Sequence, residues 1–126
     1  MSADQTFNAK AFEYDPRLNK VRKHFEKDYS QAFSLEDAAD VAGLETKHFG
    51  KYFRLLVGIR FKRWTTAARI QVAIRMIESG NQELPDIALA VGYEEYRTFG
   101  RAFKKYTQRT PSQYRRALIA GTLLDV

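Results

Sequence analysis

The sequence predicts an all-α fold in which two related helical units are joined by one long helix. Apolar residues recur at helical spacing along most of the chain, and no segment alternates as a half-buried strand would. A second observation is an internal repeat, because FGKYFR at 49–54 is matched by FGRAFK at 99–104. A third is that an alanine stands four residues before a turn glycine ahead of each copy. Two copies are too few for a solenoid and fit two related units in one small protein.

The first 14 residues have no sustained periodicity, and two interpretations stay open for them. Phe12 and the other aromatic side chains of this segment can fold back onto the body, or the segment can be a flexible tail or linker remnant. A helix is predicted to begin at Asp15, which can cap it, with Pro16 at its first position. Its apolar residues recur to about Tyr29.

The first unit is predicted to contain a short helix and a longer one, separated by a turn at Gly43. Ser34 begins a capping box of the form S-x-x-D, which places the start of the short helix. The longer helix is expected to begin at Glu45 or Thr46 and to end at Gly58. Its predicted buried residues are Phe49, Tyr52, Phe53 and Leu56.

The longest helical pattern extends from Phe61 to Ser79, where a Ser-Gly-Asn run ends it. About 17 residues of a helix span roughly 25 Å, which suits a rigid spacer between the units. A short helix over 86–91 follows, starting at Pro85, and a last helix runs from a Thr110 cap to about Leu118. The predicted domains are an N-terminal tail or linker at 1–14, a first subdomain at 15–60, a linker helix at 61–79 and a second subdomain at 80–126.

The second copy of the repeat reads as a helix with one aromatic face and one basic face. Phe99 and Phe103 lie one turn apart, whereas Arg97 and Arg101 point elsewhere. Such a helix, entered through a glycine turn at Gly92, is typical of the recognition helix of a helix-turn-helix. The sequence therefore predicts two helix-turn-helix subdomains.

The net charge of +6 is distributed unevenly along the chain. Residues 44–79 carry 8 basic and 2 acidic side chains, and residues 94–126 carry 7 and 3, whereas 1–43 and 80–93 are each acidic by 2 charges. The positive excess falls on the predicted recognition helices and the segments after them, which indicates contact with phosphates. Arg69, on the linker helix, is interpreted as a partner in a structural ion pair more readily than as a phosphate contact.

The residue types exclude several other classes of protein. The chain has no cysteine, so it has no disulfide, thiolate metal site or cysteine nucleophile, and it suits a reducing cytoplasm. It has no run of about 18 apolar residues and no apolar signal core, so we expect a soluble, unsecreted chain. The two histidines, His24 and His48, lack metal-ligand spacing, and no nucleophile has a partnered base. We therefore predict no catalysis, no metal and no cofactor.

From about Asp15 to Arg116 the chain resembles the DNA-binding domain of the AraC/XylS family of bacterial transcription regulators. The second copy carries the resemblance at Ile87, Ala88, Val91, Gly92, Tyr93, Phe99, Arg101, Phe103, Lys104, Thr110, Pro111, Tyr114 and Arg115. The first copy adds Ala39, Gly43, Phe49, Phe53, Gly58, Arg69 and Ala73. The resemblance implies about seven helices, with two recognition helices entering successive major-groove segments on one DNA face. Most members carry a separate ligand-sensing domain, so this chain resembles the stand-alone members or a domain of a larger regulator.

The resemblance also implies which residues face the DNA bases. They are Lys47, His48, Gly50 and Lys51 in the first helix, and Tyr96, Arg97, Gly100 and Arg101 in the second. We expect Lys104 and Lys105 to contact phosphates. A glycine costs about 1 kcal/mol against alanine inside a helix, so its recurrence in both copies indicates close approach of the backbone to DNA. The departures from the family pattern are Glu45, Glu94 and Glu95, which point away from DNA or read a cytosine amino group, and Gln108, which stands where glycine is common.

The expected partner is double-stranded DNA, and a transcription regulator of this kind implies RNA polymerase as a further partner. We expect a cytoplasmic, nucleoid-associated protein without membrane contact or a small-molecule domain in this chain. Two other classes stay open: a protein-interaction module of the same fold that antagonises another regulator, and an enzyme or a fragment of one. DNA-repair proteins with this domain type use a reactive cysteine, which is absent here.

Overall fold

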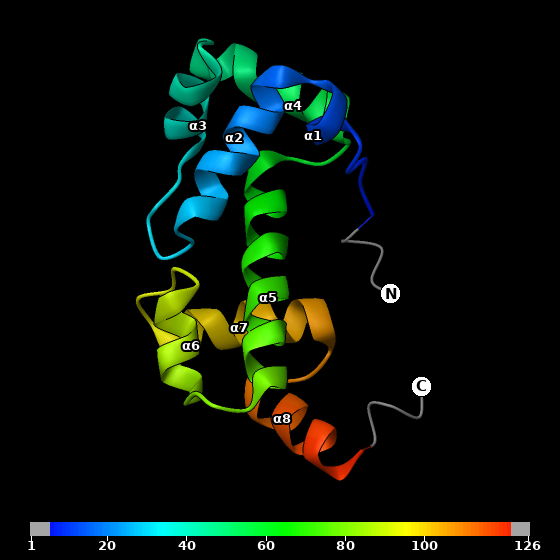
Figure 1. The fold of residues 1–126 in the computed structure, drawn as a ribbon, viewed down its shortest axis with the longest axis vertical. Coiled ribbons are helices and arrows are strands. Elements are labelled where there is room, and N and C mark those ends of the chain that lie inside the picture. Colours follow the sequence, from blue (N-terminus) through cyan, green and yellow to red (C-terminus); the bar gives the residue numbers. More distant parts are fainter. Residues whose placement is uncertain (1–5, 122–126) are drawn as a thin grey trace. The chain divides into compact units, whose positions relative to one another are not determined.

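The computed structural model describes residues 6–121, and within that range it contains eight helices and no strand (Figure 1). The helices are α1 (Ala11–Tyr14), α2 (Pro16–Lys27), α3 (Leu35–Ala42), α4 (Thr46–Val57), α5 (Phe61–Ser79), α6 (Leu84–Ala90), α7 (Tyr96–Thr107) and α8 (Pro111–Ala120). The predicted all-α class is confirmed. The chain forms two compact units, of which unit 1 ends at Thr66 and unit 2 begins at Ala67. The first turns of α5 therefore belong to unit 1, and the rest of α5 belongs to unit 2.

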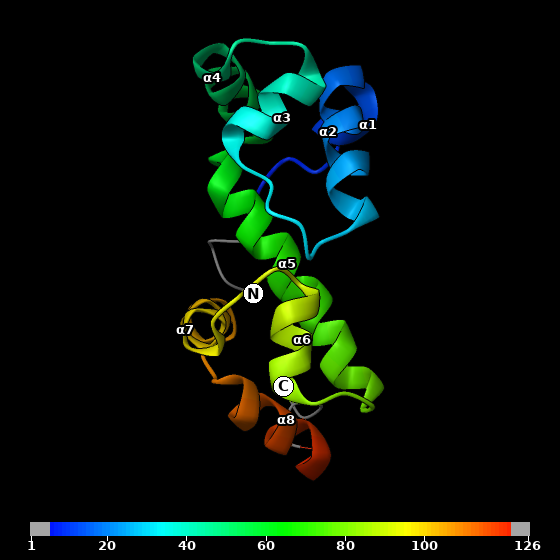
Figure 2. The same ribbon diagram turned by 90° about the vertical axis from the view of Figure 1, so that its left-hand side faces the viewer.

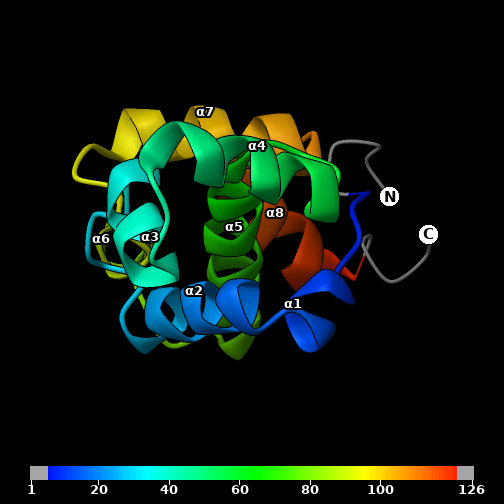
Figure 3. The same ribbon diagram turned by 90° about the horizontal axis from the view of Figure 1, so that it is seen from above.

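Local capping signals determine where the helices of unit 1 begin and end. The Asp15 carboxylate accepts the backbone N–H of Leu18 at 3.0 Å and caps α2. Ser34 and Asp37 form the predicted capping box at the start of α3, with both bonds at 3.0 Å. Gly43 ends α3 in the left-handed conformation, with φ of 74°. Figure 2 shows α3 between α4 and α2, and Figure 3 shows α1 and α2 along the side opposite α4.

The core of unit 1 is built from aromatic rings, and the N-terminal segment contributes one of them. Phe12 is 2% exposed and stacks on Trp64, with ring centroids 4.9 Å apart. Its ring also contacts Phe53 of α4 edge-on at 5.9 Å. Of the two interpretations of residues 1–14, folding back is therefore correct for Phe12, while residues 1–5 lie outside the described range. The aromatic contacts explain why a segment without periodicity is ordered, since one large buried ring can anchor a single helical turn.

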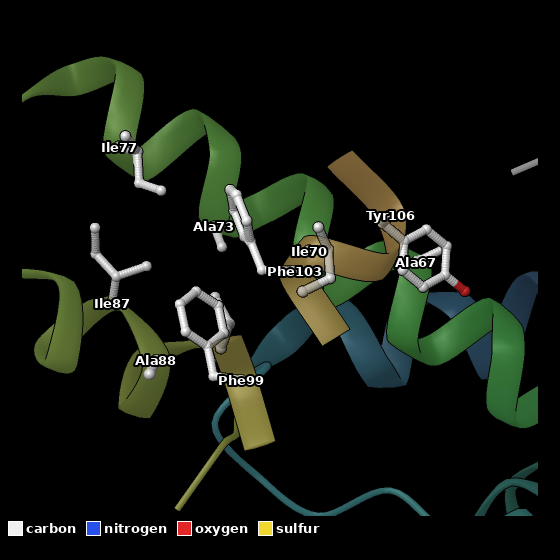
Figure 4. Packing of buried hydrophobic residues seen from close by; sticks show 10 residues of the cluster. Ala67, Ile70, Ala73, Ile77, Ile87, Ala88, Phe99, Phe103 and Tyr106 are labelled. Carbon is white, nitrogen blue, oxygen red and sulfur yellow. The ribbon is translucent and has the colours of Figure 1, made fainter. Parts of the chain in front are cut away.

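The core of unit 2 lies between α5, α6 and α7, as Figure 4 shows. Helix α7 inserts Phe99 and Phe103, each 0% exposed, between small and branched residues of α5 and α6. The other buried members of this cluster are Ala67, Ile70, Ala73, Ile77, Ile87, Ala88, Val91 and Tyr106. Because Ala73 and Ala88 have small side chains, they leave room for the two phenyl rings. This packing presents the opposite side of α7 to solvent.

Several helix boundaries differ from the sequence-based expectation by one or two residues. Helix α2 ends at Lys27, α6 begins at Leu84, and α8 continues to Ala120. The larger difference concerns burial, because Tyr52 and Leu56 are only partly buried although both were expected in the core. For Tyr52 the reason is polar. Its hydroxyl needs a polar partner and holds the ring at the edge of the core.

Gln108 ends α7 in the place where glycine is common in the family. It adopts the left-handed conformation, with φ of 69°, which is rare for a residue with a side chain. Its backbone N–H donates to the Lys104 carbonyl at 2.8 Å, and its side-chain amide donates to the Lys105 carbonyl at 3.2 Å. These bonds satisfy carbonyls that the helix end would leave without partners. The helix therefore ends at the expected position without the glycine.

Candidate nucleic-acid interface

In unit 1 the candidate interface is the exposed side of α4. Gly43 ends α3 and a two-residue turn leads to Glu45, whose carboxylate accepts the backbone N–H of His48 at 3.3 Å and caps α4. Phe49 and Phe53 face inward and are both 0% exposed. This inward anchoring determines which residues of α4 remain on the outside.

Three of the predicted DNA-facing residues of α4 are solvent-exposed, namely Lys47, His48 and Lys51. Lys47 and Lys51 are four residues apart and share one side of the helix. The structure adds Arg54, which is exposed one turn further along the same side and was missed in the sequence-based assignment. The repeat could have identified it, since Arg54 stands fifty residues before Lys104.

The two glycines at the shared helical position have different surroundings. A methyl group built on Gly50 would lie 3.5 Å from the Leu35 side chain of α3, so Gly50 faces the neighbouring helix. A methyl group built on Gly100 would meet no atom within 4 Å. Gly50 therefore has an explanation in helix packing, and the interpretation of close backbone approach to DNA rests on Gly100.

In unit 2 the corresponding surface is the exposed side of α7. Arg97, Arg101 and Lys104 are all exposed and recur at spacings of four and three residues, so they form one basic stripe. Lys105 is exposed beside this stripe. Tyr96 stands at the first position of α7, is 39% exposed, and packs against Phe99 with ring centroids 5.8 Å apart. The structure thus brings Arg97, Arg101 and Lys104 together on one side of α7. Tyr96 lies at the N-terminal end of the same helix.

The turn that leads into α7 is held by Arg69 of α5. Its guanidinium Nη1 donates to the backbone carbonyl of Val91, the C-terminal cap of α6, at 2.7 Å. Burial lowers the pKa of the Arg69 guanidinium from its usual value. Arg69 is only partly accessible. Its bond to a backbone carbonyl gives it a structural role in unit 2. A second arginine, Arg115 of α8, donates to the carbonyl of Gln82 in the α5–α6 loop at 2.5 Å.

The acidic residues near the recognition helices divide into two groups. The Glu45 carboxylate is engaged in capping α4, which explains its place at that helix N-terminus. Glu94 and Glu95 are exposed in the turn before α7, and Glu95 caps that helix without a side-chain hydrogen bond.

Within residues 6–121 no three His, Asp or Glu side chains form a group that could hold a metal ion. In the same range, no helix combines the length and apolar character needed to cross a membrane.

Two units, each with a short helix, a tight turn and an exposed basic helix, define a protein of the double helix-turn-helix class. A family model described as a helix-turn-helix domain matches residues 38–117. The chain belongs to this family, in its AraC-type form, as the motif residues predicted.

Known proteins resemble the chain in sequence and in fold. An HTH-type transcriptional regulator of Staphylococcus aureus is 30% identical over 101 residues, which are 80% of this chain and 14% of that protein. The chain therefore spans a small part of the relatives it matches. The C-terminal domain of AraT, a response regulator from Geobacillus stearothermophilus, has a similar fold, with a TM-score of 0.77 and 29% identity. The superposition covers 82% of this chain and 86% of the AraT domain. The DNA-binding domain of AdpA, a global transcriptional factor solved with a target DNA, shares the fold, with a TM-score of 0.78, 24% identity, and coverage of 84% and 95%.

Proposed function

We propose that the chain is a transcription regulator that binds double-stranded DNA sequence-specifically through α4 and α7. The single observation that carries this proposal is the matching basic stripe on the two helices. Lys47, Lys51 and Arg54 on α4 stand fifty residues before Arg97, Arg101 and Lys104 on α7, and all six are exposed. A buried aromatic side and an exposed cationic side suit a helix that is anchored to its own unit and lies in the major groove.

The proposed roles follow from side-chain chemistry. Arg97 and Arg101 are base readers, because a guanidinium can donate two parallel hydrogen bonds to the O6 and N7 atoms of guanine. Lys51 and Lys47 carry point charges without that planar geometry and contribute less discrimination. Lys104, Lys105 and Arg54 contact phosphates. His48 on α4 and Tyr96 on α7 are the other side chains proposed to face the DNA. Gly50 is proposed only as a packing residue, since its missing side chain faces Leu35.

Two recognition helices in one chain imply a bipartite site. We propose that each helix enters one of two successive major-groove segments, which lie about one helical turn, roughly 34 Å, apart on one DNA face. The AdpA domain, which has the same fold, was solved with its target DNA. The duplicated motif supports this arrangement, because a single recognition helix would not require a second basic stripe.

A mobility-shift titration and a footprint test the proposal together. The chain is titrated onto fragments of genomic DNA at two salt concentrations, and the best fragment is footprinted. We expect selective binding that weakens steeply with salt, and protection of two adjacent major-groove segments. Weak binding without fragment preference would contradict the proposal and would favour a protein-interaction module of the same fold. Protection of one groove segment alone would contradict the bipartite site while leaving DNA binding intact.

The proposal also defines the cellular context and the further partners. A DNA-binding regulator acts where the DNA is, so we propose a cytoplasmic protein associated with the nucleoid. RNA polymerase is the proposed second partner, because a regulator changes transcription through that enzyme. A pull-down of RNA polymerase on DNA that carries the selected site tests this partner, with the same DNA lacking the site as the control. We propose binding as the activity of the chain, without catalysis.

A further inference from the structure

Tyr52 of α4 is bound to the N-terminal end of α2 through a single carboxylate. Its hydroxyl donates a hydrogen bond to Asp15 Oδ2, while Asp15 Oδ1 accepts the backbone N–H of Leu18 at 3.0 Å. Asp15 therefore caps α2 and restrains the middle of the first recognition helix at the same time. The hydrogen bond from Tyr52 to Asp15 is also the main reason that the pKa of the Tyr52 phenol is raised, with partial burial as the second cause.

The ring of Tyr52 also contacts a proposed DNA-facing residue. His48 lies one turn earlier on α4, and its ring meets the Tyr52 ring edge-on, with centroids 6.4 Å apart and planes at 84°. This is a favourable geometry for two aromatic rings. The guanidinium of Arg17, at the start of α2, lies over the Tyr52 ring at 5.9 Å from its centroid. Tyr52 is thus fixed by α2 on one side and touches His48 on the other.

Unit 2 lacks this arrangement, although its recognition helix is otherwise similar. Ala102 stands fifty residues after Tyr52, and Thr98 stands fifty residues after His48. Neither residue has a ring, and Ala102 has no hydroxyl. The contact is therefore a special feature of α4 and is not required to build a helix-turn-helix unit.

We infer that Tyr52, anchored by Asp15, is a positioning residue that orients the His48 side chain toward DNA. The inference rests on the proposed contact of His48 with DNA. An exposed histidine near a helix N-terminus can occupy several rotamers, and a fixed neighbouring ring restricts it before DNA binds. Pre-ordering a contact residue raises affinity because less side-chain freedom is lost on binding. Tyr52 itself is partly buried and acts through His48.

The test is a double-mutant cycle in DNA binding, measured on the full chain with its selected site. Tyr52→Phe keeps the ring and removes the hydroxyl, and we expect it to weaken binding about threefold, within the range for one hydrogen bond. In a His48→Ala background the same change should have no effect on affinity, because the group being positioned is gone. Tyr114→Phe in unit 2 is the control, and its effect should be the same with and without His48.

A second variant separates the anchor from the helix cap. Asp15→Ser keeps a good capping residue for α2 but is too short to reach Tyr52. It should reproduce the loss of Tyr52→Phe, and the two changes together should weaken DNA binding no more than either alone. Thermal unfolding of every variant shows whether lost affinity reflects lost folding.

The outcomes distinguish this inference from the proposed function. An equal loss from Tyr52→Phe with and without His48 would overturn the positioning role while leaving His48 as a DNA contact. Unchanged affinity in His48→Ala alone would overturn the proposed contact, and the positioning role with it. In either case, selective binding by the parent chain would still support the proposed DNA-binding function.

Discussion

The backbone N–H of Asn8 donates to the carbonyl of Val57 at 2.8 Å, and this bond joins the N-terminal segment to the last turn of α4. The Asn8 side-chain amide reaches the neighbouring carbonyl of Leu56 at 3.3 Å. The last carbonyls of a helix have no partner within it, so Asn8 satisfies two of them in α4. The segment before α2 is therefore a part of the first helix-turn-helix unit, although the matched family domain begins only at residue 38.

Because the segment before α2 is part of unit 1, we predict that Phe12→Ala destabilises this unit. The phenyl ring is 2% exposed and fills space against Trp64, so truncation should cost about 3–5 kcal/mol. Urea unfolding followed by the fluorescence of Trp64, the single tryptophan, measures the loss. Phe7→Ala is the matched control, because Phe7 belongs to the same segment and is only partly buried. Equal, small shifts for both variants would show that the segment is not part of the core.

Replacing Arg69 should destabilise unit 2 without changing the salt dependence of DNA binding. Arg69→Met keeps most of the apolar stem and removes the donor to the Val91 carbonyl, at a cost of about 1–3 kcal/mol. The slope of affinity against salt should stay at the parent value, because no phosphate contact is lost. Arg75→Met, at an exposed position of the same helix, is the control for stability. A slope reduced by about one in Arg69→Met would instead identify a phosphate contact.

Lys104 and Arg54 occupy the same position in the two recognition helices, and each is predicted to contact a phosphate. Lys104→Ala and Arg54→Ala should weaken binding to all sequences alike and flatten the salt slope by about one each. The measurement is a titration of specific and random duplexes over a range of salt concentrations. Lys20→Ala, at an exposed position of α2, should leave the slope unchanged. Loss of discrimination in Lys104→Ala with an unchanged slope would make it a base reader.

Sequence discrimination should depend more on α7 than on α4. Arg97 and Arg101 lie on one side of α7, and a two-bond contact to guanine is worth about 1–3 kcal/mol of discrimination. Lys51, at the position of Arg101 in α4, lacks the planar donor pair. Selection of binding sites from random DNA with Arg97→Ala, Arg101→Ala and Lys51→Ala compares them. If Lys51→Ala blurs the preferred site more than both arginine variants, the main reader is α4.

The two helical glycines should respond differently to alanine. Gly100→Ala adds a methyl group to open space, so it should stabilise the free protein by about 1 kcal/mol and weaken DNA binding if the backbone approaches the groove there. Gly50→Ala places the methyl group at 3.5 Å from Leu35, an ordinary contact distance, and should leave DNA affinity at the parent level. Thermal unfolding and a binding titration of both variants check these outcomes. Unchanged affinity in Gly100→Ala would contradict close approach of the backbone at this position.

The sequence alone was sufficient for the features that depend on near neighbours. Ser34 with Asp37, and Thr110 with Gln113, form the predicted capping boxes, because the bonding groups are only three residues apart. The burial of the phenylalanine pairs of α4 and α7 was equally predictable, since helical geometry alone brings residues four apart to the same side. Helical periodicity predicted the all-α class, and the motif residues of the two copies identified the family.

Only the tertiary structure decided the contacts between distant positions. The bond from Tyr52 to Asp15 crosses 37 residues, and that from Asn8 to Leu56 crosses 48. No local pattern encodes such pairs, because the residues around each partner do not show which distant residue it will meet. The same reason separates Gly50 from Gly100, which are alike in sequence but differ in whether a neighbouring helix lies above them. Local spacing determined where the helices form, and packing between helices determined which of their residues remain available for binding.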